Sequence, residues 1–240
     1  MVVAISIGSC YDLRLNYSEA IKFIQKYAVD GIELVFATPK DLLDFEFVKE
    51  DLDYINSLKF KSIHMPFHEV EYVNDLGTTK LIKKGSEIAE QINADYLVFH
   101  PSKIKDYSVL DSSKKNCVEN LNSKEHNKGF QNVGDMKILL NKYPKLGLVI
   151  DTCHMLETGL NSIDFLELKD RVAGIHLAVQ WKQGERIRTH GFLQENPEQL
   201  EQIKPLLKLD VPQIIESDFY TEKVPLIEKE IELIRSFESK

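Results

Sequence analysis

Several short apolar segments of this chain end at a histidine or a carboxylate, the side chains that bind divalent metal ions. The terminal residues of six such segments are His64, His100, Glu119, Asp151, His176 and Glu216. A seventh segment, DGIELVF, carries Glu33 in the same way, and His154 lies shortly after Asp151. Histidines and carboxylates together favour Zn²⁺, with Mn²⁺ or Mg²⁺ as alternative ions.

Each of these residues alone also has an ordinary structural explanation. A lone buried histidine is commonly a hydrogen-bonded core residue, and an inward glutamate can pair with a lysine or an arginine. Together, so many buried acids and imidazoles would be very costly without compensating cations, because unpaired buried charges are avoided or bound to metals. The joint pattern therefore predicts a metal centre.

The segments that carry these residues have the composition of buried parallel strands, which are continuous apolar runs because helices cover both faces of the sheet. The eight predicted strands span residues 2–8, 31–37, 61–67, 95–101, 115–121, 146–152, 172–179 and 212–218. The predicted helices between and after them span residues 18–29, 38–58, 78–93, 132–143, 162–170, 197–208 and 222–237, and the range 38–58 contains one or two helices. We expect Ser18 to cap the first helix. This alternation predicts an α/β fold, a single (β/α)₈ TIM barrel domain over residues 1–240.

One βα unit departs from the regular alternation. Only the segment 102–116 separates His100 from Cys117, so we expect a short or missing fourth helix. The polar segments 122–131 and 180–196 follow the fifth and seventh predicted strands. Both should lie at the barrel mouth, where loops carry specificity.

A barrel of this type would bring the candidate ligands together. The C-terminal ends of its strands converge on one mouth, where catalytic groups from separate strands are collected. Because strand side chains alternate, His64 should point inward together with Ser62. His154 could not share the inward face of Asp151 on a continuing strand, so the chain should turn at Thr152. The expected result is one inward cluster at the mouth.

Composition excludes several classes of protein. The chain has 240 residues, 43% of them hydrophobic, and a formal net charge of -8, which argues against attraction of nucleic acid by bulk positive charge. Its three cysteines, Cys10, Cys117 and Cys153, are too few and too scattered for a disulfide framework. We find no secretory signal pattern and no apolar stretch of membrane-spanning length. We therefore expect a cytoplasmic protein that no membrane holds.

Several motifs resemble a known superfamily. LVIDTCH with the downstream GIHLA, the upstream SIHMPF and YLVFHP, and the late IIESD are similar to the xylose isomerase-like barrels. Within them, the sequence most resembles the endonuclease IV type of apurinic/apyrimidinic endonuclease. The resemblance implies one zinc ion held by His64, His100 and Glu119. It also implies that Glu119 bridges to a second zinc ion, whose other ligands are Asp151, His176 and Glu216.

The resemblance further implies a third zinc site, where this sequence departs from the family. His154 and His190 match two of its ligands, but Arg188 stands where the family has an aspartate. An arginine side chain carries no lone pair to offer a metal. The third site is thus expected to be incomplete unless Glu185 or water supplies the missing ligand, and we expect two ions.

Three functions remain open from the sequence. The first is a metal-dependent phosphoester hydrolase acting on abasic DNA or a related ester, with Glu119, Asp151 and Glu216 as its catalytic residues. The second is a sugar or sugar-phosphate isomerase or epimerase, in which Glu119 and Glu216 move a proton. The third is a barrel that binds metal and ligand without turnover. The residues expected to contact substrate are Glu33, Arg186 and Arg188. The sequence does not predict the oligomeric state.

Overall fold

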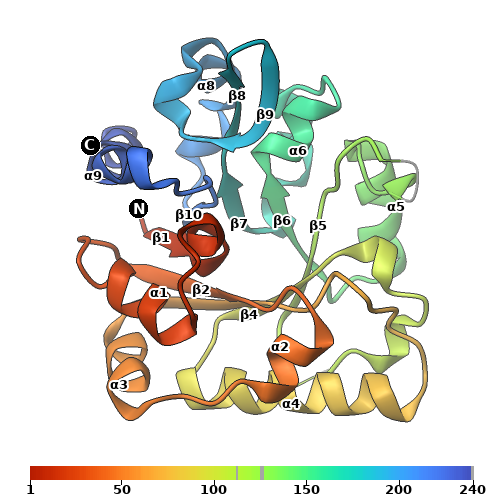
Figure 1. The fold of residues 1–240 in the computed structure, drawn as a ribbon. Coiled ribbons are helices and arrows are strands. Elements are labelled where there is room, and N and C mark those ends of the chain that lie inside the picture. Colours follow the sequence, from red (N-terminus) through yellow and green to blue (C-terminus); the bar gives the residue numbers. More distant parts are fainter. Residues whose placement is uncertain (112, 125–126, 239–240) are drawn as a thin grey trace.

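The computed structural model describes residues 1–111, 113–124 and 127–238 of the chain. Eight parallel strands close into a barrel, and helices cover its outside (Figure 1). Around the barrel the strands follow the order β1, β10, β7, β6, β5, β4, β3, β2. This closure confirms the predicted (β/α)₈ fold.

The barrel strands are short, and each lies inside or within one residue of the segment predicted for it. They are β1 (Val3–Ser6), β2 (Gly31–Val35), β3 (Phe60–His64), β4 (Tyr96–Phe99), β5 (Asn116–Glu119), β6 (Gly147–Asp151), β7 (Val172–Leu177) and β10 (Gln213–Ile215). Their register aligns the ends that carry the ligands: Asp151 pairs with His176, and His64 with Val98. Candidate ligands therefore share one end of the barrel.

Most helices on the outside differ from the predicted ranges only at their ends, but the range 38–58 contains two helices and the helix at 152–157 was not predicted. They are α1 (Tyr17–Ile24), α2 (Pro39–Asp44), α3 (Lys49–Ser57), α4 (Leu76–Ile92), α5 (Val133–Lys142), α6 (Thr152–Glu157), α7 (Ser162–Phe165), α8 (Pro197–Ile203) and α9 (Ile227–Arg235). The expected Ser18 cap is wrong. Asn16 caps α1, because its side chain accepts from the Glu19 N–H while the Glu19 carboxylate accepts from the Asn16 N–H.

Several predicted helices continue as, or begin with, 3₁₀ turns. The 3₁₀ segments are η1 (Ile7–Leu13), η2 (Pro101–Lys103), η3 (Tyr107–Val109), η5 (Leu166–Arg171), η6 (Leu193–Glu195), η7 (Leu206–Lys208) and η8 (Thr221–Leu226). Only η2 and η3 lie between β4 and β5. The fourth unit thus has no α-helix among its described residues, as predicted.

The segment after β7 is more ordered than the predicted polar loop. It forms an antiparallel hairpin of β8 (Val179–Gln183) and β9 (Arg186–Gly191), separate from the barrel sheet. Figure 1 shows this hairpin beside α6. The sequence prediction missed it because both strands are rich in polar residues and each is only partly buried. The other predicted mouth loop, 122–131, includes residues 125 and 126, which lie outside the described residues.

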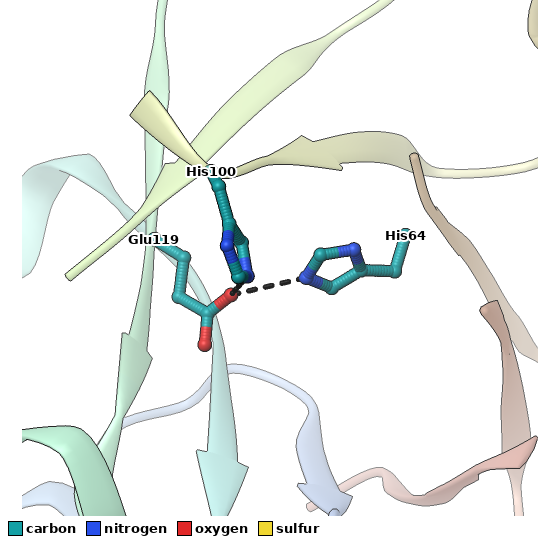
Figure 2. A group of neighbouring side chains, drawn as sticks. All are labelled: His64, His100 and Glu119. Atoms are coloured by element: carbon teal, nitrogen blue, oxygen red, sulfur yellow. Dashed lines mark hydrogen bonds and ion pairs between the residues drawn. The ribbon is translucent and has the colours of Figure 1, made fainter. Parts of the chain in front are cut away.

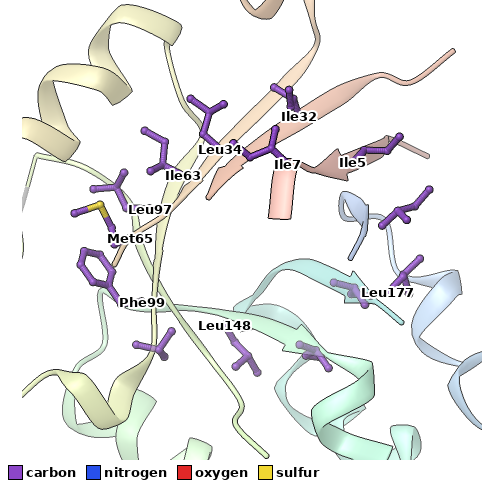
Figure 3. Close-up of a cluster of buried hydrophobic side chains, with 14 of the residues drawn as sticks. Ile5, Ile7, Ile32, Leu34, Ile63, Met65, Leu97, Phe99, Leu148 and Leu177 are labelled. Carbon is purple, nitrogen blue, oxygen red and sulfur yellow. The ribbon is translucent and has the colours of Figure 1, made fainter. Parts of the chain in front are cut away.

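Apolar side chains form two separate clusters on the barrel strands. The larger cluster packs between the strands and the surrounding helices, and includes Ile32, Leu34 and Leu97 (Figure 3). The smaller cluster fills the barrel interior below the ligands and includes Phe60 and Tyr96. None of the helices in the described ranges is long and apolar enough to cross a membrane.

Candidate metal centre

The structure brings the predicted ligands together in three overlapping groups at the barrel mouth. The first group is His64, His100 and Glu119; the second is Glu119, Asp151, His176 and Glu216; the third is Asp151, His154 and His190. Within each group, the candidate ligand atoms lie within 4.8 Å of one another. Every metal ligand predicted from the sequence belongs to one of these groups.

Glu119, at the end of β5, joins the first two groups through its two carboxylate oxygens. Its Oε2 lies 3.1 Å from Nε2 of His64 and 3.4 Å from Nε2 of His100 (Figure 2). Its Oε1 lies 3.4 Å from Nδ1 of His176. The carboxylate is therefore placed to contribute one oxygen to each of two neighbouring cations.

Hydrogen bonds fix which nitrogen of two histidines faces the centre. Nδ1 of His64 lies 3.0 Å from the carbonyl oxygen of Met65, to which it donates, so Nε2 is the nitrogen that faces Oε2 of Glu119. His176 uses the opposite nitrogen: its Nε2 donates to Oε2 of Glu33 at 3.3 Å, and Nδ1 faces the centre. Such second partners orient metal-binding histidines and select their tautomer.

The second group contains buried polar atoms that lack hydrogen-bond partners among the described residues. They are Oδ2 of Asp151, Nδ1 of His176 and Oε2 of Glu216. Nδ1 of His176 lies only 3.1 Å from Oε2 of Glu216, but without hydrogen-bonding geometry. Buried polar atoms without partners are costly, and a divalent cation accepts lone pairs from all three. These residues fit a metal ion.

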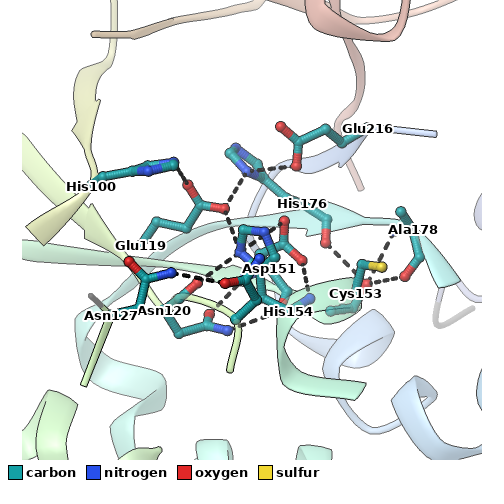
Figure 4. Close-up of polar contacts among 12 residues, drawn as sticks. His100, Glu119, Asn120, Asn127, Asp151, Cys153, His154, His176, Ala178 and Glu216 are labelled. Atoms are coloured by element: carbon teal, nitrogen blue, oxygen red, sulfur yellow. Dashed lines mark hydrogen bonds and ion pairs between the residues drawn. The ribbon is translucent and has the colours of Figure 1, made fainter. Parts of the chain in front are cut away.

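Asp151 is held rigidly at the junction between β6 and α6. Its Oδ1 accepts from the His154 N–H at 2.7 Å and so caps α6, which aims Oδ2 at the centre. The chain turns at Thr152, as predicted, and this turn brings His154 beside Asp151 (Figure 4). The short helix thus allows residues of both β6 and α6 to face the same site.

The third group differs from the expected composition. Oδ2 of Asp151 lies 3.6 Å from Nδ1 of His154 and 3.9 Å from Nε2 of His190. Asp151, rather than Glu185, therefore stands where a third ligand would be needed, because Glu185 is exposed in the turn between β8 and β9. Nδ1 of His154 also lies 3.1 Å from the carbonyl of Asn120, so Nε2 is its free nitrogen.

Glu33 occupies a different position from the expected substrate contact. It is completely buried, accepts a hydrogen bond from Ser62 Oγ at 2.9 Å, and lies behind His176. A substrate at the mouth would meet His176 first. The placement makes Glu33 a hydrogen-bond partner of His176, at a position that the lining of the neighbouring cavity does not include.

The two arginines of the hairpin lie at the surface. Arg186 and Arg188 are exposed on β9, and Nε of Arg188 donates to Oε1 of Gln183 on the neighbouring strand at 3.0 Å. Neither arginine lines the cavity beside the ligands, although Thr189 and His190 of the same strand do. The structure therefore does not bring these two side chains into the ligand cluster.

The charges of the cluster are strongly coupled. Burial alone would raise the pKa of Glu119, but the charge of His176 and hydrogen bonds from the neighbouring histidines hold it well below its ordinary value. Burial raises the pKa of Glu216 to about 7 and lowers that of His100 to about 4. His176 has a pKa well above its ordinary value, because the charges of Glu216, Glu33 and Glu119 outweigh the effect of burial. Carboxylates that hold a proton on a histidine this firmly can also hold a cation.

Two supporting residues were missed by the sequence reasoning. The side chain of Asn120 donates to the carbonyl of Asp151 at 2.9 Å and accepts from its N–H at 2.8 Å. Oγ1 of Thr152 lies within hydrogen-bond distance of the carbonyls of His176 and Ala178. Both residues directly follow a ligand and are completely buried. Buried polar residues next to ligands were the signal that could have found them.

The fold is shared with several solved structures. They include an endonuclease IV from Thermus thermophilus, with a TM-score of 0.69, 16% identity, and coverage of 99% of this chain and 98% of that one. The probable 3-DHS dehydratase AsbF of Bacillus anthracis has a TM-score of 0.73 and 12% identity, over 98% and 99% of the two chains. D-allulose 3-epimerase from Methylomonas sp., in complex with D-allulose, has a TM-score of 0.68 and 16% identity, over 98% and 96%.

The fold of these neighbours is the one expected from the resemblance of the sequence to the xylose isomerase-like barrels. At such low identity, the similarity establishes the fold alone. No family model and no curated protein matches the sequence. Another solved structure with this fold contains a bound zinc atom. The neighbours include an endonuclease, a probable dehydratase and an epimerase, so this fold supports more than one chemistry.

Proposed function

We propose that this protein is a divalent-metal-dependent phosphoester hydrolase. The observation that carries the proposal is the position of Glu119, whose two oxygens face two different groups of ligands. A bridging carboxylate between two ligand groups is the arrangement expected for a two-metal centre. His64 and His100 support this proposal, because a single ion held by the second group would leave them without a role.

In this proposal the residues have two roles, as metal ligands and as groups that orient the attacking water. His64, His100 and Glu119 would hold one ion, and Glu119 with Asp151, His176 and Glu216 would hold the other. When bound, such a pair of ions polarises the phosphoryl group and lowers the pKa of water. Asp151 and Glu216 would orient the attacking water. Its oxygen forms a new bond to phosphorus, the ester P–O bond breaks, and the alcohol leaves with a proton.

Zinc is the ion we propose, with Mn²⁺ or Mg²⁺ as alternatives. The donor set contains both imidazole and carboxylate, which suits Zn²⁺ at a catalytic site. The proposed stoichiometry is two ions per chain. The group formed by Asp151, His154 and His190 could accept a third ion, but His154 already faces Glu119 and the carbonyl of Asn120.

Metal analysis and hydrolysis assays on the same protein test the proposal. Protein purified without added metal should contain about two equivalents of zinc and should hydrolyse a phosphodiester such as bis-p-nitrophenyl phosphate. Duplex DNA with one abasic site tests the endonuclease form of the activity. Absence of hydrolysis on every phosphoester, in protein shown to carry two ions, would rule out the hydrolase.

A sugar isomerase or epimerase is the second candidate. The specific observation in its favour is that Glu119 and Glu216 flank His176, and that Glu216 has a pKa of about 7. A carboxylate with such a pKa can give and take a proton at neutral pH. Exchange of a ketose α-proton with solvent, retained in His100→Ala but lost in Glu216→Gln, would decide for this function.

A further inference from the structure

A cavity of about 470 Å³ opens beside the metal centre on the side of β4, β5 and β6. Three candidate ligands form one wall: His100, His154 and His190. Its volume lies in the range of small-molecule sites. A molecule that contacts the ions could therefore extend into this cavity.

Two lysines line the cavity away from the ligands. Lys103 ends η2, immediately after β4, and Lys124 lies in the segment after β5. Across the described chain, neither lysine has a carboxylate oxygen within 4.0 Å, whereas the neighbouring Lys105 pairs with Glu71. Glu157 lines the same cavity. Among the described lining residues, two lysines against one carboxylate favour an anionic group, although the whole chain carries a net charge of -8.

Asn127 belongs to the lining of the cavity and is anchored to its neighbour Asn122. Asn127 is only 6% exposed, and its Nδ2 donates to Oδ1 of Asn122 at 2.8 Å. Its Oδ1 has no hydrogen-bond partner in the described ranges. This oxygen is shielded from solvent, so the hydrogen bond between Asn127 and Asn122 orders the cavity wall and leaves the ligand contacts to other lining residues.

One wall of the cavity is apolar. The ring of Phe67 stacks on His100 with centroids 4.7 Å apart and an angle of 23°. Phe67 lines the cavity together with Leu121. The C–H face of a sugar ring can pack against such a surface, next to the histidine that faces the first ion.

We propose that this cavity binds the distal part of a small sugar phosphate ester that carries a second phosphate. Lys103 and Lys124 bind that phosphate, and the sugar packs against Phe67. The proposal rests on the proposed function, since the first phosphate occupies the metal centre. A small molecule is favoured over DNA because the anion-binding groups line a bounded cavity of a chain with negative net charge.

A series of fructose derivatives tests the proposal in the zinc-loaded protein. Calorimetry compares fructose bisphosphate, phosphorylated on both terminal carbons, with fructose monophosphate. We expect the bisphosphate to bind at least about tenfold tighter, the scale of one charge-assisted contact. In the double variant Lys103→Gln/Lys124→Gln this preference should fall below about threefold.

Two further double variants serve as comparisons. Lys83→Gln/Lys105→Gln removes the same charge from lysines that do not line the cavity, and should keep the preference for the bisphosphate. Arg186→Gln/Arg188→Gln tests the hairpin as an alternative phosphate site. Loss of the preference in either of these variants, but not in Lys103→Gln/Lys124→Gln, would overturn the proposal.

The remaining outcomes are also decisive. Equal affinity for the two fructose phosphates, or no binding at millimolar concentration, would overturn the assignment of the cavity. Abasic duplex DNA that binds tighter than the bisphosphate, and depends on the same two lysines, would assign the cavity to nucleic acid instead. A preserved preference without phosphoester hydrolysis would keep the cavity and reject the hydrolase.

Discussion

The barrel interior contains two layers that differ in chemistry although the same strands build both. The lower layer is apolar, with Phe60 on β3, Cys117 on β5 and Val149 on β6. Two residues further along β5 and β6, the upper layer contains Glu119 and Asp151. The two layers share the inward face of each strand because side chains alternate with a period of two.

Within one barrel, the lower layer contributes mainly to stability and the upper layer mainly to the candidate metal centre. The lower layer removes apolar surface from water and needs no partner outside itself. The upper layer contains buried polar atoms that lack hydrogen bonds within the described chain, such as Oδ2 of Asp151. Such atoms reduce stability unless a cation binds them. Changes in the lower layer should therefore affect unfolding, and changes in the upper layer should affect metal binding.

The largest functional effect is expected for Glu119→Gln. The amide retains the shape but loses the charge shared by two ligand groups, so both ions should be lost or weakly held. Phosphoester hydrolysis should fall by roughly 10³-fold, the scale seen when one directly contacting group is removed. Metal analysis after gel filtration and initial rates measure both effects. Glu50→Gln, at an exposed position on α3, is the control, and an unchanged zinc content in Glu119→Gln would contradict the bridging role.

The lower layer should show the opposite response. Phe60→Ala removes a buried ring from the barrel interior and should lower the free energy of unfolding by about 3–5 kcal/mol. Zinc content per folded chain should stay the same. Urea titrations with metal analysis separate the two effects, and Ile138→Ala, at an exposed position on α5, should change stability by less than about 0.5 kcal/mol. Zinc loss in folded Phe60→Ala would show that the two layers are not independent.

A smaller effect is expected for Glu33→Gln, between the two layers. The variant keeps an oxygen near His176 but weakens the hydrogen bond that selects the histidine tautomer. Zinc affinity should fall roughly 10–100-fold, as for other second partners of ligating histidines. Competition with a chelator measures the affinity. If Glu33→Gln matched Glu119→Gln in zinc loss, Glu33 would be a direct ligand.

The smallest effect is expected from pH. Because burial raises the pKa of Glu216 to about 7, this carboxyl is protonated below neutral pH in the metal-free protein. Zinc must displace that proton and also the proton that His176 holds, so its affinity should rise with pH both below and above 7. Glu216 contributes at most roughly tenfold per unit, and only up to about pH 7. Chelator competition at a series of pH values measures the slope, and Glu216→Gln should reduce it. A wild-type affinity that falls as the pH rises from about 6 to about 7 would refute the assignment.

Much of the fold could be predicted because its signals are local. Continuous apolar strands, helical periodicity between them and the missing helix after His100 all depend on neighbouring residues. The errors have the same explanation. Ser18 was chosen as a cap by residue type, but the reciprocal bonds between Asn16 and Glu19 determine where α1 begins. The β8–β9 hairpin was missed because its polar strands pair with each other outside the barrel.

The sequence by itself determined which residues could bind metal and that they share the inward face at one end of the barrel, because strand alternation and barrel closure follow from the pattern. Only the tertiary structure decided what each one contacts. It buried Glu33 behind His176, placed Asp151 beside His154 and His190, and left Arg188 at the surface. These outcomes depend on distances between side chains from separate strands and loops, which no local pattern contains.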